Sequence, residues 1–192
     1  MLPIPKPRIP LPSPADFTPA QRKIHDDVVK GPRGVLRGPL RAVIHRPDLA
    51  ERWSALGEML RYGTSLSPRL SELAILITAR GCDAPFEWYA HEPPAREAGI
   101  AESTIDAIRQ GAHPAALADD ERAVYDYALE LNRKHTVSDA THQKALDQLG
   151  VVGVVELTAL VGYYNMVAMM LNAQGIPMPE GTPSPLAEIR QE

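Results

Sequence analysis

The chain has 192 residues, of which 44% are hydrophobic and 23% charged, and its formal net charge is −4. This composition is typical of a soluble globular domain, and the acidic balance argues against binding to nucleic acid or to an anionic membrane. A single cysteine, Cys82, excludes an intrachain disulfide. The proline-containing first residues have no continuous apolar stretch and do not resemble a secretory signal, so we expect a cytoplasmic protein.

Two proline-rich segments without periodicity, residues 1–17 and 177–192, flank a region, 18–176, whose pattern is helical throughout. We expect the flanking segments to be extended arms that pack on a neighbouring subunit, and the centre to be one domain. The chain shows no convincing strand alternation and no Asn-Gly hairpin signal. The sequence therefore predicts an all-α bundle of about eight helices.

The first three predicted helices cover residues 18–31, 47–63 and 67–81. Each has a proline at or next to its start and glycine at its end, and two begin with a threonine or serine that can cap the helix. The third is apolar on most of its sides, which predicts a buried position. Glu72 nevertheless lies within it, and a carboxylate in such a helix needs an explanation.

The next predicted helix starts with residues 84–91. Pro93 and Pro94 follow, and they favour either a kinked extension of this helix or a short separate helix. The final helix is apolar, but Glu156, Gly162 and Asn165 interrupt it, so a buried core helix is favoured over a membrane span. The final helix covers residues 151–175, and the three predicted helices before it cover 102–111, 118–135 and 138–150.

Glu72, Glu87 and His91 form the strongest candidate for chemistry. Glu87 and His91 are four residues apart and share a helix face, and the short loop before them can fold Glu72 against that face. Two carboxylates around one histidine can transfer protons near neutral pH. The alternative is an ordinary surface pair, with Glu72 as an isolated polar residue. Because neither Glu-x-x-His repeats nor His-Glu-x-x-His occur, we expect no metal.

Three further residues are candidates for contact with a substrate. Cys82 has no second thiol to resolve an oxidised sulfur, so we interpret it as a loop or core residue and not as a redox centre. Tyr164 of the final helix is the tyrosine that we expect at the cavity, and His45, just before a helix start, could face it too. The candidate catalytic residues are thus Glu72, Glu87 and His91, and the candidate substrate-binding residues are His45, Tyr164 and Cys82.

The block "RLSELAILITARGCDAPFEWYAHEPPAREAGI", followed by "VVELTALVGYYNMVAMMLNA", resembles the carboxymuconolactone decarboxylase family, within the alkylhydroperoxidase-D-like superfamily. The resemblance spans about residues 35–176. It implies an all-α fold, assembly as a homotrimer or homohexamer, and a cavity near subunit contacts. The peroxidase branch carries a Glu, a Cys-x-x-Cys pair and a His; here Ala84 and Glu87 occupy the two cysteine positions. The resemblance therefore does not extend to a disulfide relay.

For the decarboxylase branch, the resemblance implies an enzyme without cofactor in which His91 is the general acid/base, Glu87 orients it, and Glu72 accepts a proton or positions a group. Our leading hypothesis is a carboxy-lyase acting on a small carboxylated lactone or aromatic-derived compound. The alternatives are a thiol-dependent peroxidase and a non-catalytic oligomeric protein that binds small molecules. Five arginines could bind a substrate carboxylate: Arg37, Arg41, Arg46, Arg69 and Arg80.

Overall fold

A computed structural model describes residues 6–187 of the chain, and over these residues every regular element is a helix. This confirms the predicted all-α class. A short 3₁₀ helix, η1 (Pro14–Asp16), precedes eight α-helices. These are α1 (Pro19–Lys30), α2 (Leu40–Val43), α3 (Pro47–Tyr62), α4 (Pro68–Gly81), α5 (Pro85–Glu97), α6 (Glu102–Arg109), α7 (Asp119–Lys134) and α8 (Asp139–Gln174).

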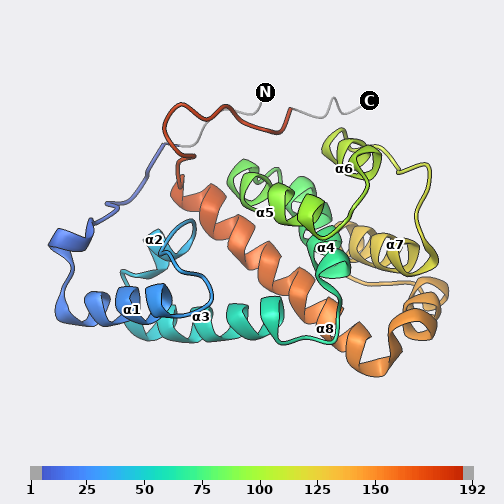
Figure 1. Ribbon diagram of the computed structural model, residues 1–192, viewed down its shortest axis with the longest axis horizontal. Coiled ribbons are helices and arrows are strands. Elements are labelled where there is room, and N and C mark those ends of the chain that lie inside the picture. The colour runs from blue at the N-terminus through green and yellow to red at the C-terminus, as the bar shows by residue number, and fades with distance from the viewer. Residues whose placement is uncertain (1–5, 188–192) are drawn as a thin grey trace.

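The buried helix α4 and the long helix α8 form the centre of the molecule. α4 packs against α5, α7 and α8, and α8 also contacts α3, α5 and α7. Figure 1 shows α8 crossing the molecule diagonally, with α1–α3 on one side and α4–α7 on the other. Most of α4 is buried because its apolar residues point in nearly every direction, as its sequence predicts. Its start is fixed by the Ser67 hydroxyl, which accepts a hydrogen bond from the Leu70 N–H.

Three features of the helices relate to the predictions from the sequence. α5 continues through Pro93 and Pro94 as one helix, because the flanking turns and its packing on α4 hold the segment although each proline removes one N–H donor. The predicted boundary at residue 150 is confirmed, because α8 consists of two helical parts that meet at a kink at the non-helical Gly150, with φ of 67°. The four-residue helix α2 has no sequence signal of its own.

The described parts of the two arms make contacts with their own chain, and the expected packing on a neighbouring subunit stays a prediction. The Arg8 N–H donates to the Gln174 carbonyl at 3.0 Å. In the C-terminal segment Ile176 and Leu186 are fully buried, and the Arg80 guanidinium donates to the Ala187 carbonyl at 3.0 Å. The outermost parts of both arms, residues 1–5 and 188–192, lie outside the described residues.

The outer face of α8 carries exposed apolar residues. By length and composition, α8 is the one helix among the described residues that could cross a membrane. Its residues Leu157, Leu160 and Leu171 nevertheless lie in the core shared with the other helices. α8 therefore has the position of a central helix in a bundle. On the outer face Val155 and Met169 are 63% and 64% exposed.

Candidate active site

The turn between α4 and α5 brings Glu72 and His91 together. The Ala84 N–H donates to the Ala79 carbonyl at 2.9 Å, and Asp83 takes a left-handed conformation with φ of 45°, so the chain reverses within a few residues. α5 then folds back along α4. As a result, His91 Nδ1 lies 2.7 Å from Glu72 Oε2, and both residues are buried. The sequence prediction that the short loop joins these two residues is in agreement with this geometry.

The contact with Glu72 defines the state of the imidazole. A carboxylate only accepts hydrogen bonds, so the proton lies on His91 Nδ1, and Nε2 keeps its lone pair. Burial lowers the pKa of His91, and the Glu72 carboxylate opposes this in part. Arg61 Nη2 lies 3.7 Å from the other oxygen of Glu72 and connects the pair to α3. At neutral pH His91 is therefore an uncharged proton acceptor.

Glu87 is the most unusual group in the site. Its side chain is 1% exposed, and neither carboxyl oxygen has a hydrogen-bond partner among the described residues. Burial raises the pKa of Glu87 well above that of an ordinary glutamate. The expected contact between Glu87 and His91 is not formed: the structure gives the orienting position to Glu72 and leaves the Glu87 carboxyl group buried without a partner among the described residues.

Glu87 and His91 are among the residues that line one cavity of about 60 Å³, large enough for a small group or a few water molecules. Tyr164 also lines it and packs edge-on against the His91 ring, with the ring centroids 5.0 Å apart. Burial raises the pKa of Tyr164, which keeps the phenol neutral. The apolar part of the wall comes from α2, α3, α5 and α8, with residues Leu40, Trp53, Phe86, Val167 and Leu171.

Two of the predicted substrate-binding residues do not reach this cavity. His45 faces the N-terminal segment, where its Nε2 lies 2.7 Å from the Pro10 carbonyl oxygen. Cys82 lines a different cavity, and its thiol donates to Asn165 Oδ1 at 3.2 Å. Burial raises the pKa of Cys82 to about 11, so the thiol is protonated at neutral pH and is a poor nucleophile.

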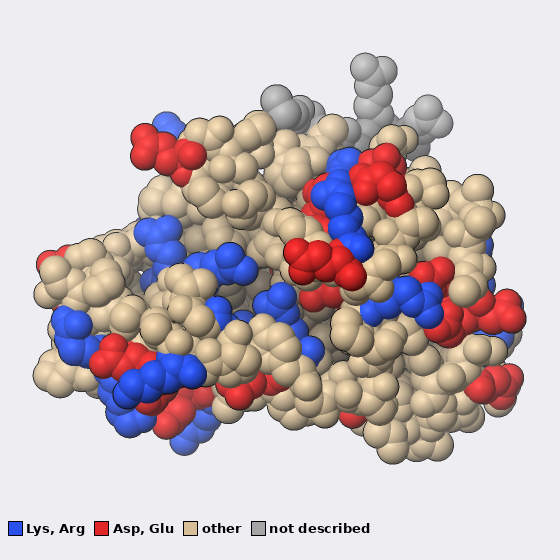
Figure 2. Space-filling model, viewed as in Figure 1, with Lys and Arg blue, Asp and Glu red and all other residues tan. Residues whose placement is uncertain are grey.

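Three arginines line the cavity, and only one of them, Arg37, was among the five candidates from the sequence. Arg33 lies in the loop after α1, and Arg61 in the last turn of α3. Figure 2 shows basic side chains gathered around a hollow where, in Figure 1, the α2–α3 region faces α5. No spacing rule relates these loop and helix-end arginines to Glu72 or His91, so the sequence carried no signal for them.

The guanidinium of Arg33 has an edge without a partner. Its Nε and Nη2 atoms are buried and make no hydrogen bond among residues 6–187. Gly57 on α3 makes room for this group, because a Cβ atom there would collide with Arg33 Nη2 and with the Tyr163 hydroxyl. Nε and Nη2 form the side of the guanidinium that holds a carboxylate with two parallel hydrogen bonds.

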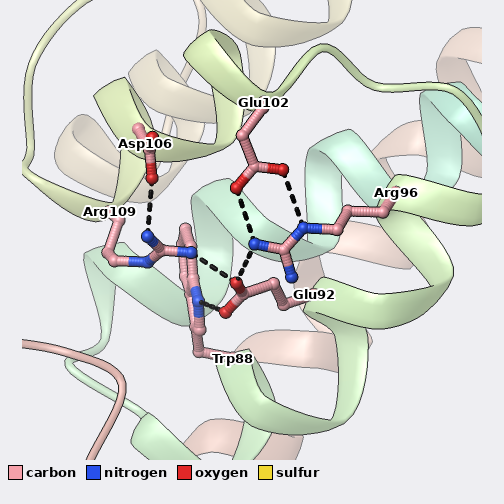
Figure 3. A network of polar contacts seen from close by, with 6 residues as sticks. All are labelled: Trp88, Glu92, Arg96, Glu102, Asp106 and Arg109. Atoms are coloured by element: carbon pink, nitrogen blue, oxygen red, sulfur yellow. Dashed lines mark hydrogen bonds and ion pairs between the residues drawn. The ribbon is translucent and has the colours of Figure 1, made fainter.

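A polar network fixes α5 to α6 beside the site. Figure 3 shows that the Glu92 carboxylate accepts from the Trp88 indole at 2.6 Å and also pairs with the guanidinium groups of Arg96 and Arg109. Because Trp88 and Glu92 each follow a cavity residue directly in sequence, this network holds the α5 turns that carry Glu87 and His91. The six residues drawn are Trp88, Glu92, Arg96, Glu102, Asp106 and Arg109.

Comparison with solved structures shows that the fold is a known one. An uncharacterized peroxidase-related protein from Ralstonia eutropha JMP134, described as an alkylhydroperoxidase AhpD core, superposes with a TM-score of 0.73 at 20% identity, covering 94% of this chain and 95% of that one. A peroxidase-related protein from Silicibacter sp. TM1040 gives 0.75 at 16% identity, covering 92% and 95%. A variant of the debrominase Bmp8 in complex with 2,3,4-tribromopyrrole gives 0.66 at 13% identity, covering 87% and 88%.

At these identities the likeness of the structures establishes the fold alone. No curated protein sequence matches the chain. Residues 47–130, which run from the start of α3 into α7 and contain Glu72, Glu87 and His91, match the model of the carboxymuconolactone decarboxylase family. This agrees with the resemblance of the Glu72–His91 block in the sequence. The matched segment, 47–130, supports the resemblance of this part of the chain to the carboxymuconolactone decarboxylase family, and the solved structures show that the fold is AhpD-like and helical.

Proposed function

We propose that the protein is a cofactor-independent carboxy-lyase that acts on a small unsaturated carboxylate by proton transfer. The observation that carries this proposal is Glu87, a buried carboxyl group without a hydrogen-bond partner, on the wall of the cavity that His91 also lines. A buried acid left without a partner costs stability. Such a group is expected where its proton is used in a reaction.

The two residues have opposite states at neutral pH. Glu87 keeps its proton because burial raises its pKa, whereas His91 keeps a free Nε2 because burial lowers its pKa. The cavity thus holds one proton donor and one proton acceptor at the same time, which is the arrangement that acid–base catalysis needs. Glu72 holds the imidazole through Nδ1 and is a positioning residue.

The arginines of the cavity favour an anionic substrate. With Glu87 neutral, Arg33, Arg37 and Arg61 give the cavity lining a positive charge, which attracts a carboxylate. The unpartnered edge of Arg33 is the group that we assign to a retained carboxylate or lactone oxygen of the substrate. The apolar wall formed by Trp53, Phe86 and Val167 suits the neutral ring and the loss of neutral carbon dioxide.

The reaction proceeds by cleavage of the bond between the substrate carbon and its departing carboxylate. Carbon dioxide leaves, and the electron pair moves into the conjugated carbonyl system. Glu87 then donates its proton to the substrate carbon, so that a carboxylate is replaced by hydrogen. The proton that Glu87 gives up is replaced from solvent, with His91 Nε2 as the carrier. A peroxidase reaction has less support, because Cys82 is protonated and lies outside this cavity.

The proposal is tested by measuring carbon dioxide release from a series of unsaturated lactone acids. We expect turnover by the wild type, and for Arg33→Met a KM raised by about 10- to 150-fold with kcat little changed, since charged hydrogen bonds contribute about 1.5–3 kcal/mol. Arg46→Met is the matched control, because Arg46 pairs with Asp48 at the surface and does not line this cavity. Absence of turnover on the whole series by the wild type would contradict the assignment, and equal KM values for both variants would contradict the role of Arg33.

We also propose that the protein is a homo-oligomer that associates through the outer face of α8. The exposed residues of this face recur at alternating spacings of three and four, as in a helix–helix seam: Val152, Val155, Ala159, Gly162, Met166 and Met169. Small residues at the middle of the stripe allow another helix to approach closely, and the methionines adapt to a partner surface. The trimeric or hexameric state expected from the family resemblance would cover this stripe.

The double variant Val155→Lys, Met169→Lys is expected to dissociate the oligomer, because two charges would be buried at the seam. Size-exclusion chromatography with light scattering measures the change in mass. Met59→Lys on α3, where the native side chain is 48% exposed, is the control and should leave the mass unchanged. A wild type that is monomeric at micromolar concentration, or an oligomer that survives the double variant, would contradict the assignment of α8.

A further inference from the structure

A second cavity lies between the end of α4 and helices α6, α7 and α8. It has a volume of about 350 Å³ and shares no lining residue with the cavity of Glu87 and His91. Its polar wall comes from the end of α4, from α7 and from Asn165 of α8. The residues on that wall are Arg80, Cys82, Asp83, Tyr125, Asn132, Arg133 and Asn165.

Arg80 is the group of this cavity that lacks a partner. The side chain is 5% exposed, and its Nε and Nη2 atoms are buried without a hydrogen bond within the described part of the chain. Only Nη1 is engaged: it donates to the Ala187 carbonyl at 3.0 Å and lies 3.3 Å from Asp83 Oδ1. A buried guanidinium with two unsatisfied nitrogens is costly, so a partner for them is expected.

The unsatisfied edge defines the shape of that partner. Nε–H and one N–H of Nη2 point the same way in the plane of the guanidinium, and this edge fits the two oxygens of a carboxylate. The same edge is unsatisfied on Arg33 in the first cavity. Asp83 neutralises Arg80 only in part, because it is about half exposed and approaches the opposite nitrogen, Nη1. Arg133 adds a second positive charge to the lining.

The rest of the cavity fits an apolar body. Ile77, Ile108 and Leu129 supply apolar wall. The amides of Asn132 and Asn165 are bonded to each other at 2.7 Å and are largely satisfied within the protein, so they form a preorganised surface and do not compete for the carboxylate. A ligand with one anionic end and one apolar end matches this distribution of charge.

We propose that this second cavity is a binding site for a small monocarboxylate with an apolar or aromatic body, whose carboxylate is held by the Nε/Nη2 edge of Arg80 after a rotation of this buried side chain toward the cavity. The site is separate from the proposed reaction, and its existence does not depend on the function assigned to Glu87 and His91. It would allow the protein to respond to an organic acid other than the one in the first cavity.

Cys82 provides the readout, because it is the one cysteine of the chain and lines this cavity. Sodium benzoate serves as the probe, and the rate at which N-ethylmaleimide alkylates Cys82 in the full-length protein is measured by mass spectrometry. Benzoate at ten times its Kd should slow alkylation by about tenfold. The neutral isostere benzamide should have no effect, since it lacks the charge that Arg80 requires.

Two variants separate this site from the first. Arg80→Met should fold, because it replaces a buried, partly unsatisfied cation by an apolar chain of similar length, and benzoate should no longer protect its thiol. Arg33→Met should behave like the wild type. If Arg80→Met does not fold, Arg80→Lys retains the charge but not the two-nitrogen edge, and most of the protection should be lost. Protection that persists in the Arg80 variant, equal protection by benzamide, or no protection of the wild type at any benzoate concentration would overturn the proposal.

Discussion

Replacing Glu87 by Gln is expected to lower kcat by about 10²- to 10⁴-fold, the usual contribution of a general acid, while the protein becomes more stable at neutral pH. Activity falls because the amide cannot give up a proton to the substrate. Stability rises because the wild type has to keep this carboxyl group protonated in a buried position where it has no partner. The opposite direction of the two effects is what distinguishes a functional acid from a structural one.

The pH dependence of unfolding tests the state of Glu87 directly. The pKa of Glu87 is raised in the folded protein, so above the pKa of the unfolded chain, near 4.3, the folded state holds one proton more than the unfolded state. The free energy of unfolding therefore falls with rising pH from that point up to the folded pKa. The Glu87→Gln variant should lack this decline, which urea titrations between pH 4 and 9 would measure.

Glu97→Gln provides the matched control, because Glu97 lies on the same helix but is exposed. It should leave both the decline and the turnover unchanged. If the Glu87→Gln and wild-type profiles run parallel over the whole range, Glu87 is ionised in the folded state and cannot be the proton donor.

Removing His91 is expected to have an effect on turnover of similar size. His91→Ala deletes the proton carrier and should lower kcat by about 10²- to 10⁴-fold. In the wild type, activity requires the free base, so turnover should fall as the pH drops through the pKa of His91, which burial places below its usual value. The kcat–pH profile measures this acid limb.

Glu72→Gln separates positioning from catalysis. Glu72 raises the pKa of His91 through its charge and its hydrogen bond, so the variant should shift the acid limb to lower pH as well as reducing kcat. Glu156→Gln serves as a control, because Glu156 accepts from Ser65 and does not line the cavity. An acid limb that stays in place in Glu72→Gln would show that the titrating group is not His91.

The local elements of this fold could be predicted from the sequence because their signals are local. Thr18 and Ser67 cap helices through bonds to N–H groups three residues away, and the apolar periodicity of residues 67–81 predicts a buried helix. The contact between Glu72 and His91 could also be predicted, because the loop of three residues between α4 and α5 leaves few ways for these two helices to pack against each other. Local signals could not show that α5 continues through Pro93 and Pro94, since neighbouring helices stabilise it there.

The sequence by itself determined the helical class and the meeting of Glu72 with His91 across the short loop between α4 and α5. Only the tertiary structure decided their roles: Glu72 pairs with Nδ1 of His91, whereas Glu87 is left buried and without a partner. It also placed Arg33 in the cavity, and directed His45 and Cys82 away from it. The reason is physical: spacing fixes which side chains share a helix face, but burial and the positions of distant loops decide which group is desolvated and which one finds a partner.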